Sequence, residues 1–459
     1  MAELVWKGKR RARARSALAQ ASPIRTDERY GDAASDAWHN RLIVGDRAIA
    51  LAALLPELAG KVALVYIDPP FDTGGEFRFH ATIPGAPDGA PRIAVPAYKD
   101  ARGLDEWLKW FYETAVLLRG LLAKDGSLYV HLDPHSSHYA KVVLDEVFGP
   151  AAFQREIIWR IGWVSGFKSR ARNWIRNHDV ILFYAMGGAR GLRFCKEYVP
   201  YPPGYVRRDG VPPRGRGYPV DDVWNGSDVD RLDSIQIMSF SGEKVGFPTQ
   251  KNESLIARVV RASSSPGDIV LDCFVGSGTT AVVAEKLGRR WVACDASPIA
   301  IHSTRKRLLA TRDVRPFVVE TVGSLEMGPR RKLSARVAVE GGTATIELES
   351  FAMPARAAPG PARANVTHWS QWIEGWCVDW DHDGGALRAG SQAWRPRGQA
   401  SLPLSMSHAY QGPGRRVALV KAFDVLGGAT TKTLVVEVGP IEGAMPSGNQ
   451  RRKCSTFAP

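Results

Sequence analysis

The chain has 459 residues, of which 44% are hydrophobic and 24% charged, a composition typical of globular proteins and not of disordered or fibrous ones. Its 61 Lys and Arg residues exceed its 47 Asp and Glu residues, so the formal net charge is +14. No run reaches the roughly 18 apolar residues of a membrane helix, and we expect no membrane partner. The positive charge favours an anionic partner, most commonly nucleic acid, although a general bias towards Arg and Ala would give the same excess.

Cysteines are few and have no paired spacing, which predicts a reducing compartment, no disulfide framework and no structural zinc. They are Cys195, Cys273, Cys294, Cys377 and Cys454. Asp381-His382-Asp383 carries side chains that can ligate metals, but the two glycines that follow favour a turn. We therefore expect no metal site.

The N-terminal residues 1–37 are basic and rich in alanine, without a clear apolar period, and we expect them to form an arm that is poorly packed at its start. From residue 38, apolar runs of strand length alternate with stretches of helical spacing. The predicted strands are residues 41–46, 62–67 and 127–132, and the predicted helices are residues 51–58, 104–122 and 139–148. Continuous apolar runs suit strands that are buried on both faces of a parallel sheet. Residues 38–159 therefore predict the first half of a doubly wound α/β sheet.

Residues 160–248 have a different composition, dominated by Gly, Pro, Arg and aromatic residues, with one strand-like run at 180–184. Arg side chains bind phosphates, and aromatic rings stack on unstacked bases. We interpret this interval as a target-recognition segment that binds nucleic acid. The alternative is a set of solvated loops.

The α/β pattern resumes at residue 249 and continues to about 320. It comprises predicted helices at 253–262 and 279–287 and predicted strands at 269–272 and 291–295. Residues 330–442 instead contain short segments in which apolar and polar residues alternate, separated by Gly and Pro turns. This pattern predicts an all-β sandwich that resembles immunoglobulin-like or PKD-like accessory domains in its general sequence character. Residues 443–459 form a tail.

The tetrapeptide Asp68-Pro69-Pro70-Phe71 directly follows the apolar run 62–67. Ligands of open α/β sheets bind at the carboxyl ends of the strands, so chemistry is expected here. The two prolines remove two backbone donors and leave rigid carbonyl acceptors beside a carboxylate, which together can hold the N–H groups of an exocyclic amine. Taken alone, the tetrapeptide is equally compatible with an ordinary turn.

A glycine loop, LDCFVGSGTT at residues 271–280, follows one predicted strand and opens a predicted helix. Gly276 and Gly278 permit a tight turn and a close backbone approach. Asp295 ends the next predicted strand, at a spacing typical of an acid that binds ribose hydroxyls. The loop lacks the Lys-Ser/Thr of an ATP-binding phosphate loop.

Together, the two motifs resemble an amino-type DNA methyltransferase of the β class, in which the catalytic half precedes the S-adenosylmethionine half. The resemblance covers about residues 38–312 and is greatest to the modification subunits of type III restriction systems and their adenine-methylating relatives. Gly45-Asp46 and Thr249-Gln250-Lys251 fall where the family has cofactor-contacting segments. The sequence departs from the family at Asp72, where Asn is usual, and at Asn252, where Pro is usual.

The resemblance implies a Rossmann-like sheet with permuted motif order and methyl transfer from S-adenosylmethionine to N6 of an adenine flipped out of duplex DNA. In this scheme, Asp68 and the Pro69 carbonyl hold the amine, Pro70 completes the motif and Phe71 stacks on the base. The implied cofactor-binding residues are Asp46, Thr249, Lys251, Asp272, Phe274, Gly276, Ser277, Gly278, Thr279 and Asp295, the last of these at the ribose.

Three alternatives stay open: cytosine-N4 methylation, an RNA substrate, and a non-catalytic DNA-binding module on a methyltransferase fold. The resemblance admits a restriction subunit and a second copy of the chain as protein partners. We expect a cytoplasmic protein that associates with the nucleoid through DNA.

Overall fold

The protein is described by a computed structural model that covers residues 3–9, 22–32, 38–161, 170, 172–225, 242–324, 329–358 and 363–440. The predicted tail, 443–459, lies outside the described residues, as do parts of the predicted arm and of the predicted recognition segment. None of the helices among the described residues has the length and apolar character that crossing a bilayer requires.

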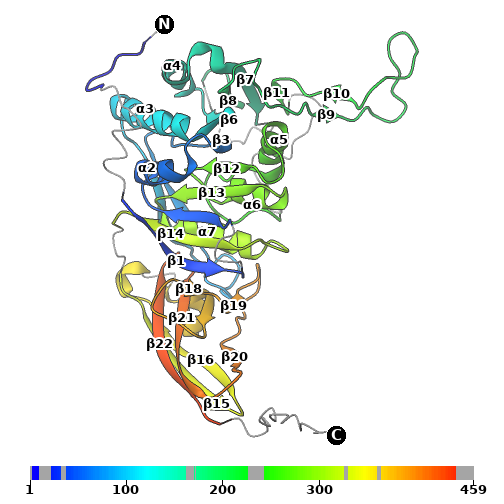
Figure 1. The fold of residues 1–459 in the computed structure, drawn as a ribbon. Helices are drawn as coiled ribbons and strands as arrows, with labels where there is room; N and C mark the ends of the chain where they lie inside the picture. Colours follow the sequence, from blue (N-terminus) through cyan, green and yellow to red (C-terminus); the bar gives the residue numbers. More distant parts are fainter. Residues whose placement is uncertain are drawn as a thin grey trace, which may run out of the picture.

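Among the described residues, eleven strands form one mixed sheet at the centre of the molecule (Figure 1). Its strands are β1 (Ile24–Tyr30), β2 (Asn40–Val44), β3 (Val62–Ile67), β6 (Leu122–Leu132), β7 (Phe153–Arg160), β8 (His178–Ala185), β11 (Val223–Trp224), β12 (Ile269–Asp272), β13 (Arg290–Asp295), β14 (Phe317–Val322) and β18 (Leu387–Arg388). Their order across the sheet is β11-β7-β8-β6-β3-β12-β13-β2-β14-β1-β18. The six strands from β6 to β14 in this order are parallel. The predicted α/β sheet is thus confirmed as a mixed sheet.

Helices cover both faces of the sheet. The first face carries α2 (Arg47–Leu58), α3 (Leu104–Leu121) and α4 (Ser137–Phe148), and the second carries α5 (Glu253–Ser263), α6 (Thr279–Lys286) and α7 (Pro298–Leu309). Val65 of β3 belongs to the core under α2 and α3, whereas its neighbour Leu64 belongs to the core under α5 and α6. Consecutive strand residues point to opposite faces, so a strand buried on both faces needs an apolar residue at every position.

The two motifs leave the same edge of the sheet because β3 and β12 are adjacent parallel strands. Leu64 pairs with Val270, and Val65 pairs with Leu271, although about 200 residues lie between them. The Asp68 tetrapeptide and the glycine loop therefore begin side by side.

Parts of the predicted N-terminal arm, 1–37, pack against the body of the molecule. Residues 24–30 form β1, which pairs antiparallel with β14. The polar sequence IRTDERY hides this strand, because its buried Glu28 is stabilised by charged partners and not by apolar burial. Near the N-terminus, Trp6 is also buried, with its ring 5.8 Å from that of Tyr112 on α3.

The predicted recognition segment, 160–248, is not one continuous unit. β8 lies inside this interval but belongs to the main sheet, where it pairs antiparallel with β6 and β7. Beyond β8, β9 (Tyr198–Val199) and β10 (Tyr218–Pro219) pair at the base of an arm that extends away from the body (Figure 1).

Residues 332–438 contain two antiparallel sheets that share one apolar core, and we call this part the β domain. The first sheet comprises β15 (Lys332–Glu340), β16 (Thr343–Ala352) and β20 (Ser405–Ala409), and the second comprises β17 (Ile373–Asp379), β19 (Ser391–Trp394), β21 (Gly414–Asp424) and β22 (Ala429–Val438). Ile346 of the first sheet and Trp376 and Val420 of the second lie in the same core.

Strand pairing and buried charges join the β domain to the main sheet. β18 pairs with β1. Glu28 of β1 accepts hydrogen bonds from Lys421 of β21 at 2.6 Å, Arg305 of α7 at 3.1 Å and Tyr30 at 2.8 Å. A hairpin of β4 (Gly75–Ala81) and β5 (Ile93–Asp100) forms a further connection, since its Ile83 and Ile93 lie in the core of the β domain.

Candidate active site

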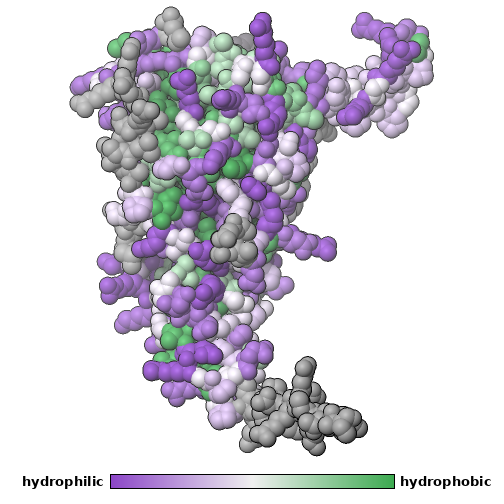
Figure 2. Space-filling view, in the orientation of Figure 1, coloured by the Kyte–Doolittle hydropathy of each residue, from purple (hydrophilic) through white to green (hydrophobic). Residues whose placement is uncertain are grey.

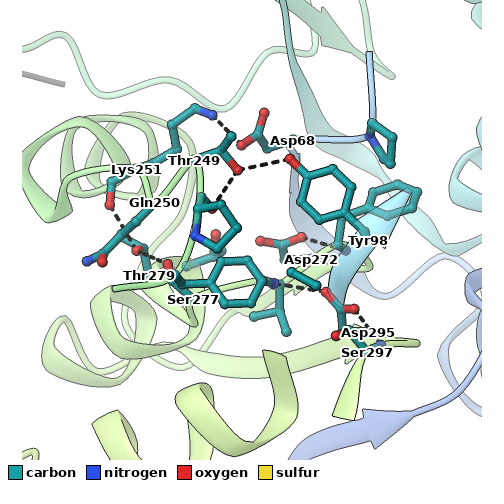
Figure 3. A pocket seen from close by; sticks show the side chains of 18 of the residues that line it. Asp68, Tyr98, Thr249, Gln250, Lys251, Asp272, Ser277, Thr279, Asp295 and Ser297 are labelled. Carbon is teal, nitrogen blue, oxygen red and sulfur yellow. Dashed lines mark hydrogen bonds and ion pairs between the residues drawn. The ribbon is translucent and has the colours of Figure 1, made fainter. Parts of the chain in front are cut away.

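Two adjoining cavities lie at the carboxyl ends of β3 and β12, and we name each by the motif that lines it. The glycine-loop cavity is lined by residues that include Tyr66, Asp272, Phe274, Gly276, Ser277, Thr279, Asp295 and Ser297 (Figure 3). The Asp-Pro-Pro cavity is lined by residues that include Pro69, Phe71, Thr73, Phe77, Asp100, Asp133, Arg176, Asp179 and Lys244. Both cavities are lined by Asp68, Pro70, Tyr98, Phe247, Thr249, Gln250 and Lys251.

Asp68 lies where the two cavities meet, immediately after β3. Its Oδ2 accepts a short hydrogen bond from Nζ of Lys251 (Figure 3). Its Oδ1 is buried and has no hydrogen-bond partner among the described residues. A buried acceptor without a partner is energetically unfavourable, so this atom is suited to an N–H donor that arrives with a ligand.

The other residues of the tetrapeptide form one wall of the Asp-Pro-Pro cavity. The Pro70 carbonyl accepts a hydrogen bond of 2.7 Å from the Trp107 indole of α3, which fixes the turn against the helix. Pro69 and Phe71 line the cavity, and the Phe71 ring centroid lies 5.8 Å from Nζ of Lys251. An aromatic ring at this position offers a stacking surface for a planar ligand.

Asp72, the first departure from the family pattern, has a structural role. Its φ is 63°, a left-handed conformation that Asn and Asp tolerate better than most other residues. Its carboxylate accepts from the amides of Arg102 and Gly103, at 2.6 and 3.0 Å, where α3 begins. Asp and Asn both satisfy these requirements, so this departure leaves the turn intact.

Close packing explains the two glycines of the glycine loop. Gly278 has φ +87°, and a Cβ atom there would lie 2.7 Å from Oγ1 and 2.9 Å from Cα of Thr304 on α7. Gly276 has φ +50°, and a Cβ atom would lie 3.2 Å from the Phe247 ring. Gly276 lines the cavity, whereas Gly278 lets α6 and α7 approach each other.

Two carboxylates of the glycine-loop cavity have raised pKa values because they are enclosed by protein. Burial raises the pKa of Asp272 to about 7 and that of Asp295 to about 6. Asp295 accepts from the amides of Gly276 and Ser297, at 3.0 and 2.8 Å, which orient it, and Asp272 accepts from the Phe274 amide at 2.9 Å. Each carboxylate keeps lone pairs for hydroxyl or amine donors of a ligand.

The segment before α5 joins the two cavities. Thr249 and Lys251 line both, and the Lys251 carbonyl accepts from the Thr279 hydroxyl at 3.0 Å. Asn252, the second departure from the family pattern, precedes α5 with φ −77°, a value that proline also adopts. The backbone conformation that proline would favour is therefore retained.

Asp46 is not brought together with the other predicted cofactor-binding residues. It lines neither cavity, and its carboxylate instead caps α2 by accepting from the amides of Ala48 and Ile49, at 2.8 and 3.4 Å. Asp46 also pairs with Arg47.

Several residues that line the Asp-Pro-Pro cavity were not among the predicted site residues. Asp179, at the start of β8, pairs with Arg176 and lies 3.4 Å from Nε2 of the buried His131. Burial acts to raise the pKa of Asp179, but the His131 hydrogen bond and nearby cations outweigh it and hold that pKa below its usual range. The sequence Asn177-His178-Asp179 resembles a segment of the amino-type DNA methyltransferases, and this resemblance is the signal that could have pointed to Asp179. No sequence pattern pointed to Tyr98 or Phe247.

A doubly wound sheet with a glycine-loop cavity and a carboxylate-bearing motif at the carboxyl ends of its strands is typical of α/β proteins that bind a ligand at this edge. A family model described as DNA methylase matches residues 62–306, more than half of the chain, and the chain belongs to this family. The predicted identification as a DNA methyltransferase is thereby confirmed. S-adenosylmethionine is the methyl donor that this membership implies.

Curated relatives agree with this family assignment. The chain is 28% identical over 331 residues to the type II methyltransferase M.EcaI of Enterobacter cloacae, which covers 60% of this chain and 70% of the relative. It is 28% identical over 296 residues to the DNA adenine methyltransferase YhdJ of Escherichia coli K12, which covers 61% and 84%. It is 23% identical over 323 residues to the Mod subunit of the type III restriction-modification enzyme StyLTI of Salmonella typhimurium, which covers 53% and 49%.

Proposed function

We propose that the protein methylates the exocyclic N6 of an adenine that is flipped out of duplex DNA. One observation carries this proposal: Oδ1 of Asp68 is a buried acceptor without a partner at the junction of the two cavities. An exocyclic amine in the Asp-Pro-Pro cavity would supply the missing donor. The relative named as a DNA adenine methyltransferase supports adenine as the target.

The side chains that line the glycine-loop cavity fit S-adenosylmethionine. Asp295, held by two backbone amides, would accept from ribose hydroxyls, and Asp272 offers a second acidic group. Phe274, Ser277 and Thr279 complete the wall. When bound there, S-adenosylmethionine would supply an electrophilic methyl group.

Asp68 acts on the target nitrogen, which is a poor nucleophile because its lone pair is conjugated with the ring. By accepting one N–H, Oδ1 draws the nitrogen towards tetrahedral geometry and frees its lone pair for the methyl group. Lys251 keeps the carboxylate oriented through Oδ2. The nitrogen loses one proton on methylation, and Oδ1 is the adjacent acceptor. Phe71 stacks on the flipped base.

The arm that begins at β9 and returns at β10 is suited to contact DNA. Arg207, Arg208, Arg214 and Arg216 are exposed along it, and Figure 2 shows mostly hydrophilic side chains at its tip. Its base is attached to the body, because Arg261 of α5 pairs with Glu197 at 2.6 Å. An arm that is attached to the body at its base and carries exposed arginines can bind phosphates of the DNA backbone.

Within this proposal, residues 38–159 form the catalytic half, 249–320 the cofactor half, and the described parts of 160–248 outside β8 the recognition segment. The β domain is an accessory sandwich of immunoglobulin-like or PKD-like type. A restriction subunit and a second copy of the chain are the protein partners we propose, and the protein acts on cytoplasmic DNA at the nucleoid. The StyLTI Mod subunit is the relative that supports a restriction partner.

Mass spectrometry of nucleosides, which identifies the modified base, and modification-sensitive sequencing, which locates it, test the proposal. DNA from cells that express the protein should contain N6-methyladenine in one sequence motif, and cells that express Asp68→Ala should lack it. N4-methylcytosine without N6-methyladenine would overturn the adenine assignment. Binding of DNA without transfer of labelled methyl groups to DNA or RNA would identify a non-catalytic module.

A further inference from the structure

Tyr98, on β5, occupies the boundary between the two cavities. Its hydroxyl lies 3.2 Å from Oγ1 of Thr249, and its ring stacks on Phe77 of β4, with ring centroids 4.8 Å apart. In Figure 3 the Tyr98 side chain lies between Asp68 and Asp295, the residues that mark the two reacting partners in the proposed function. A shift of this ring would change the passage between the two cavities.

The end of the hairpin nearer the site is bonded to the catalytic turn. The Asp100 carboxylate, at the end of β5, accepts from the Asp72 amide at 2.6 Å and from the Thr73 amide and hydroxyl at 3.1 and 2.7 Å. The Asp100 carbonyl accepts from the Gly74 amide at 2.7 Å. The segment after Phe71 and the strand that carries Tyr98 therefore move together.

The far end of the same hairpin is embedded in the β domain. Ile83 and Ile93 are buried in the core that contains Ile346 and Trp376. The Pro84 carbonyl accepts a hydrogen bond of 2.8 Å from the Gln371 side chain. One short hairpin thus reaches from the reacting atoms to the C-terminal sheets.

The β domain is itself held against the catalytic body, independently of the hairpin. β18 continues the main sheet beside β1, and Lys421 pairs with the buried Glu28. Lys306 of α7 forms a further ion pair, with Glu374 of β17. Because these three attachments are built from strand pairing or from paired charges, the β domain offers a fixed support for the tip of the hairpin.

We propose that Tyr98 is a positioning residue for methyl transfer and that the β domain holds it in place through the β4–β5 hairpin. The role of Tyr98 in methyl transfer rests on the proposed function. The structural connection from the β domain to the site through the hairpin does not depend on that function. It gives the β domain a role in the reaction, as the part that sets one wall of the active site.

Substitutions at Tyr98 test the first part in the full-length chain. Tyr98→Ala should lower kcat by about 10²-fold, the size of effect expected when a reacting group is misplaced by about 1 Å, with a smaller change in KM for DNA. Tyr98→Phe keeps the ring and loses only the hydrogen bond to Thr249, so its activity should stay within about tenfold of wild type. Wild-type kinetics in Tyr98→Ala would overturn the role of Tyr98.

Two glycines in the hairpin turn offer a matched pair for the second part. Gly85 and Gly89 have similar φ values, +77° and +81°, but a Cβ atom at Gly85 would lie 3.1 Å from Cβ of Ala400 in the β domain, whereas one at Gly89 would meet nothing within 4 Å. The two substitutions, Gly85→Leu and Gly89→Leu, therefore place a side chain at similar left-handed φ values, but only the side chain at position 85 contacts the β domain. We expect at least tenfold lower kcat in Gly85→Leu than in Gly89→Leu, on the order of the cost of misplacement.

Hydrogen exchange provides a readout that does not depend on catalysis. Amides of residues 72–74, 95 and 97–100 should exchange faster in Gly85→Leu than in Gly89→Leu, with equal exchange in the main sheet. Equal exchange and equal kinetics in the two variants would overturn the connection. If the wild-type chain transfers no methyl group, the proposed function fails, and the exchange contrast still decides whether the hairpin couples the β domain to the site.

Discussion

Lys251 donates a hydrogen bond to Oδ2 of Asp68, although 183 residues separate the two in the chain. The contact exists because β3 and β12 are neighbours, which brings the segment before α5 against the catalytic turn. It gives the two carboxylate oxygens different roles: Oδ2 is bonded to Lys251, whereas Oδ1 can accept a hydrogen bond from a ligand. The proposed reaction therefore depends on one acceptor atom.

Replacing Asp68 with Asn should lower methyl transfer by at least about 10²-fold, because the site loses a charged acceptor aimed at the reacting nitrogen. Transfer of a labelled methyl group to DNA measures this loss, and calorimetric titration should show a much smaller change in cofactor affinity. Asp88→Asn, at an exposed position of the hairpin turn, is the matched control. Wild-type transfer in Asp68→Asn would refute the assignment.

Cofactor affinity should rise with pH between about 5 and 7 and level off above. Burial raises the pKa of Asp272 to about 7 and that of Asp295 to about 6, so both carboxyls are protonated at low pH and ionise across this interval. The ionised forms accept hydroxyl donors more strongly and favour a cationic ligand. Titration calorimetry with S-adenosylmethionine at successive pH values provides the measurement, and Asp295→Asn should flatten the lower part of the curve. A dissociation constant independent of pH would contradict this prediction.

Replacing Glu28 with Gln should destabilise the protein by roughly 3–5 kcal/mol, because Arg305 and Lys421 lose the carboxylate that neutralises them at a buried site. Burial alone would raise the pKa of Glu28, but Arg305 and Lys421 outweigh it and lower that pKa to about 2. The stabilisation is therefore complete above pH 4.5 and disappears as the pH falls from 4.5 to about 2. Thermal unfolding of both proteins across this interval checks the expectation: wild type should lose stability more steeply than Glu28→Gln. Parallel curves would count against it.

Changing the four arm arginines, Arg207, Arg208, Arg214 and Arg216, to Ala should weaken DNA binding and reduce its dependence on salt. Each lost phosphate contact reduces the magnitude of the negative slope of log affinity against log salt concentration by about 0.9. Fluorescence anisotropy with duplex DNA at several salt concentrations measures both effects. Arg336→Ala, on β15 at the opposite end of the molecule, should leave the slope unchanged (Figure 1). An unaltered slope in the fourfold variant would place the DNA elsewhere.

The main sheet and the two motifs were predictable because their signals are local. Val62–Ile67 is apolar at every position, as a strand between two helical layers must be, and the glycine loop combines a strand, two glycines and a helix start in ten residues. Such patterns need no knowledge of the rest of the chain.

The features that could not be predicted from the sequence depend on contacts between residues that are distant in the chain. β1 is a polar strand whose Glu28 is buried only because Arg305 and Lys421 meet it. Tyr98 lies in a hairpin strand interrupted by Pro96, and its place in the site follows from the fold of the β domain and from Thr249. Neither residue stands in a local pattern that distinguishes it from a surface residue.

The pairing of β18 with β1 has a consequence for attempts to shorten the protein. β1 would otherwise be the last strand of the main sheet, with unpaired N–H and C=O groups along its outer side, and Leu387–Arg388 covers part of it. An uncovered edge strand is a template for pairing with another molecule. A catalytic fragment that ends before the β domain would therefore expose such an edge together with Glu28, which would keep Arg305 but lose Lys421. We expect this fragment to self-associate through its sheets.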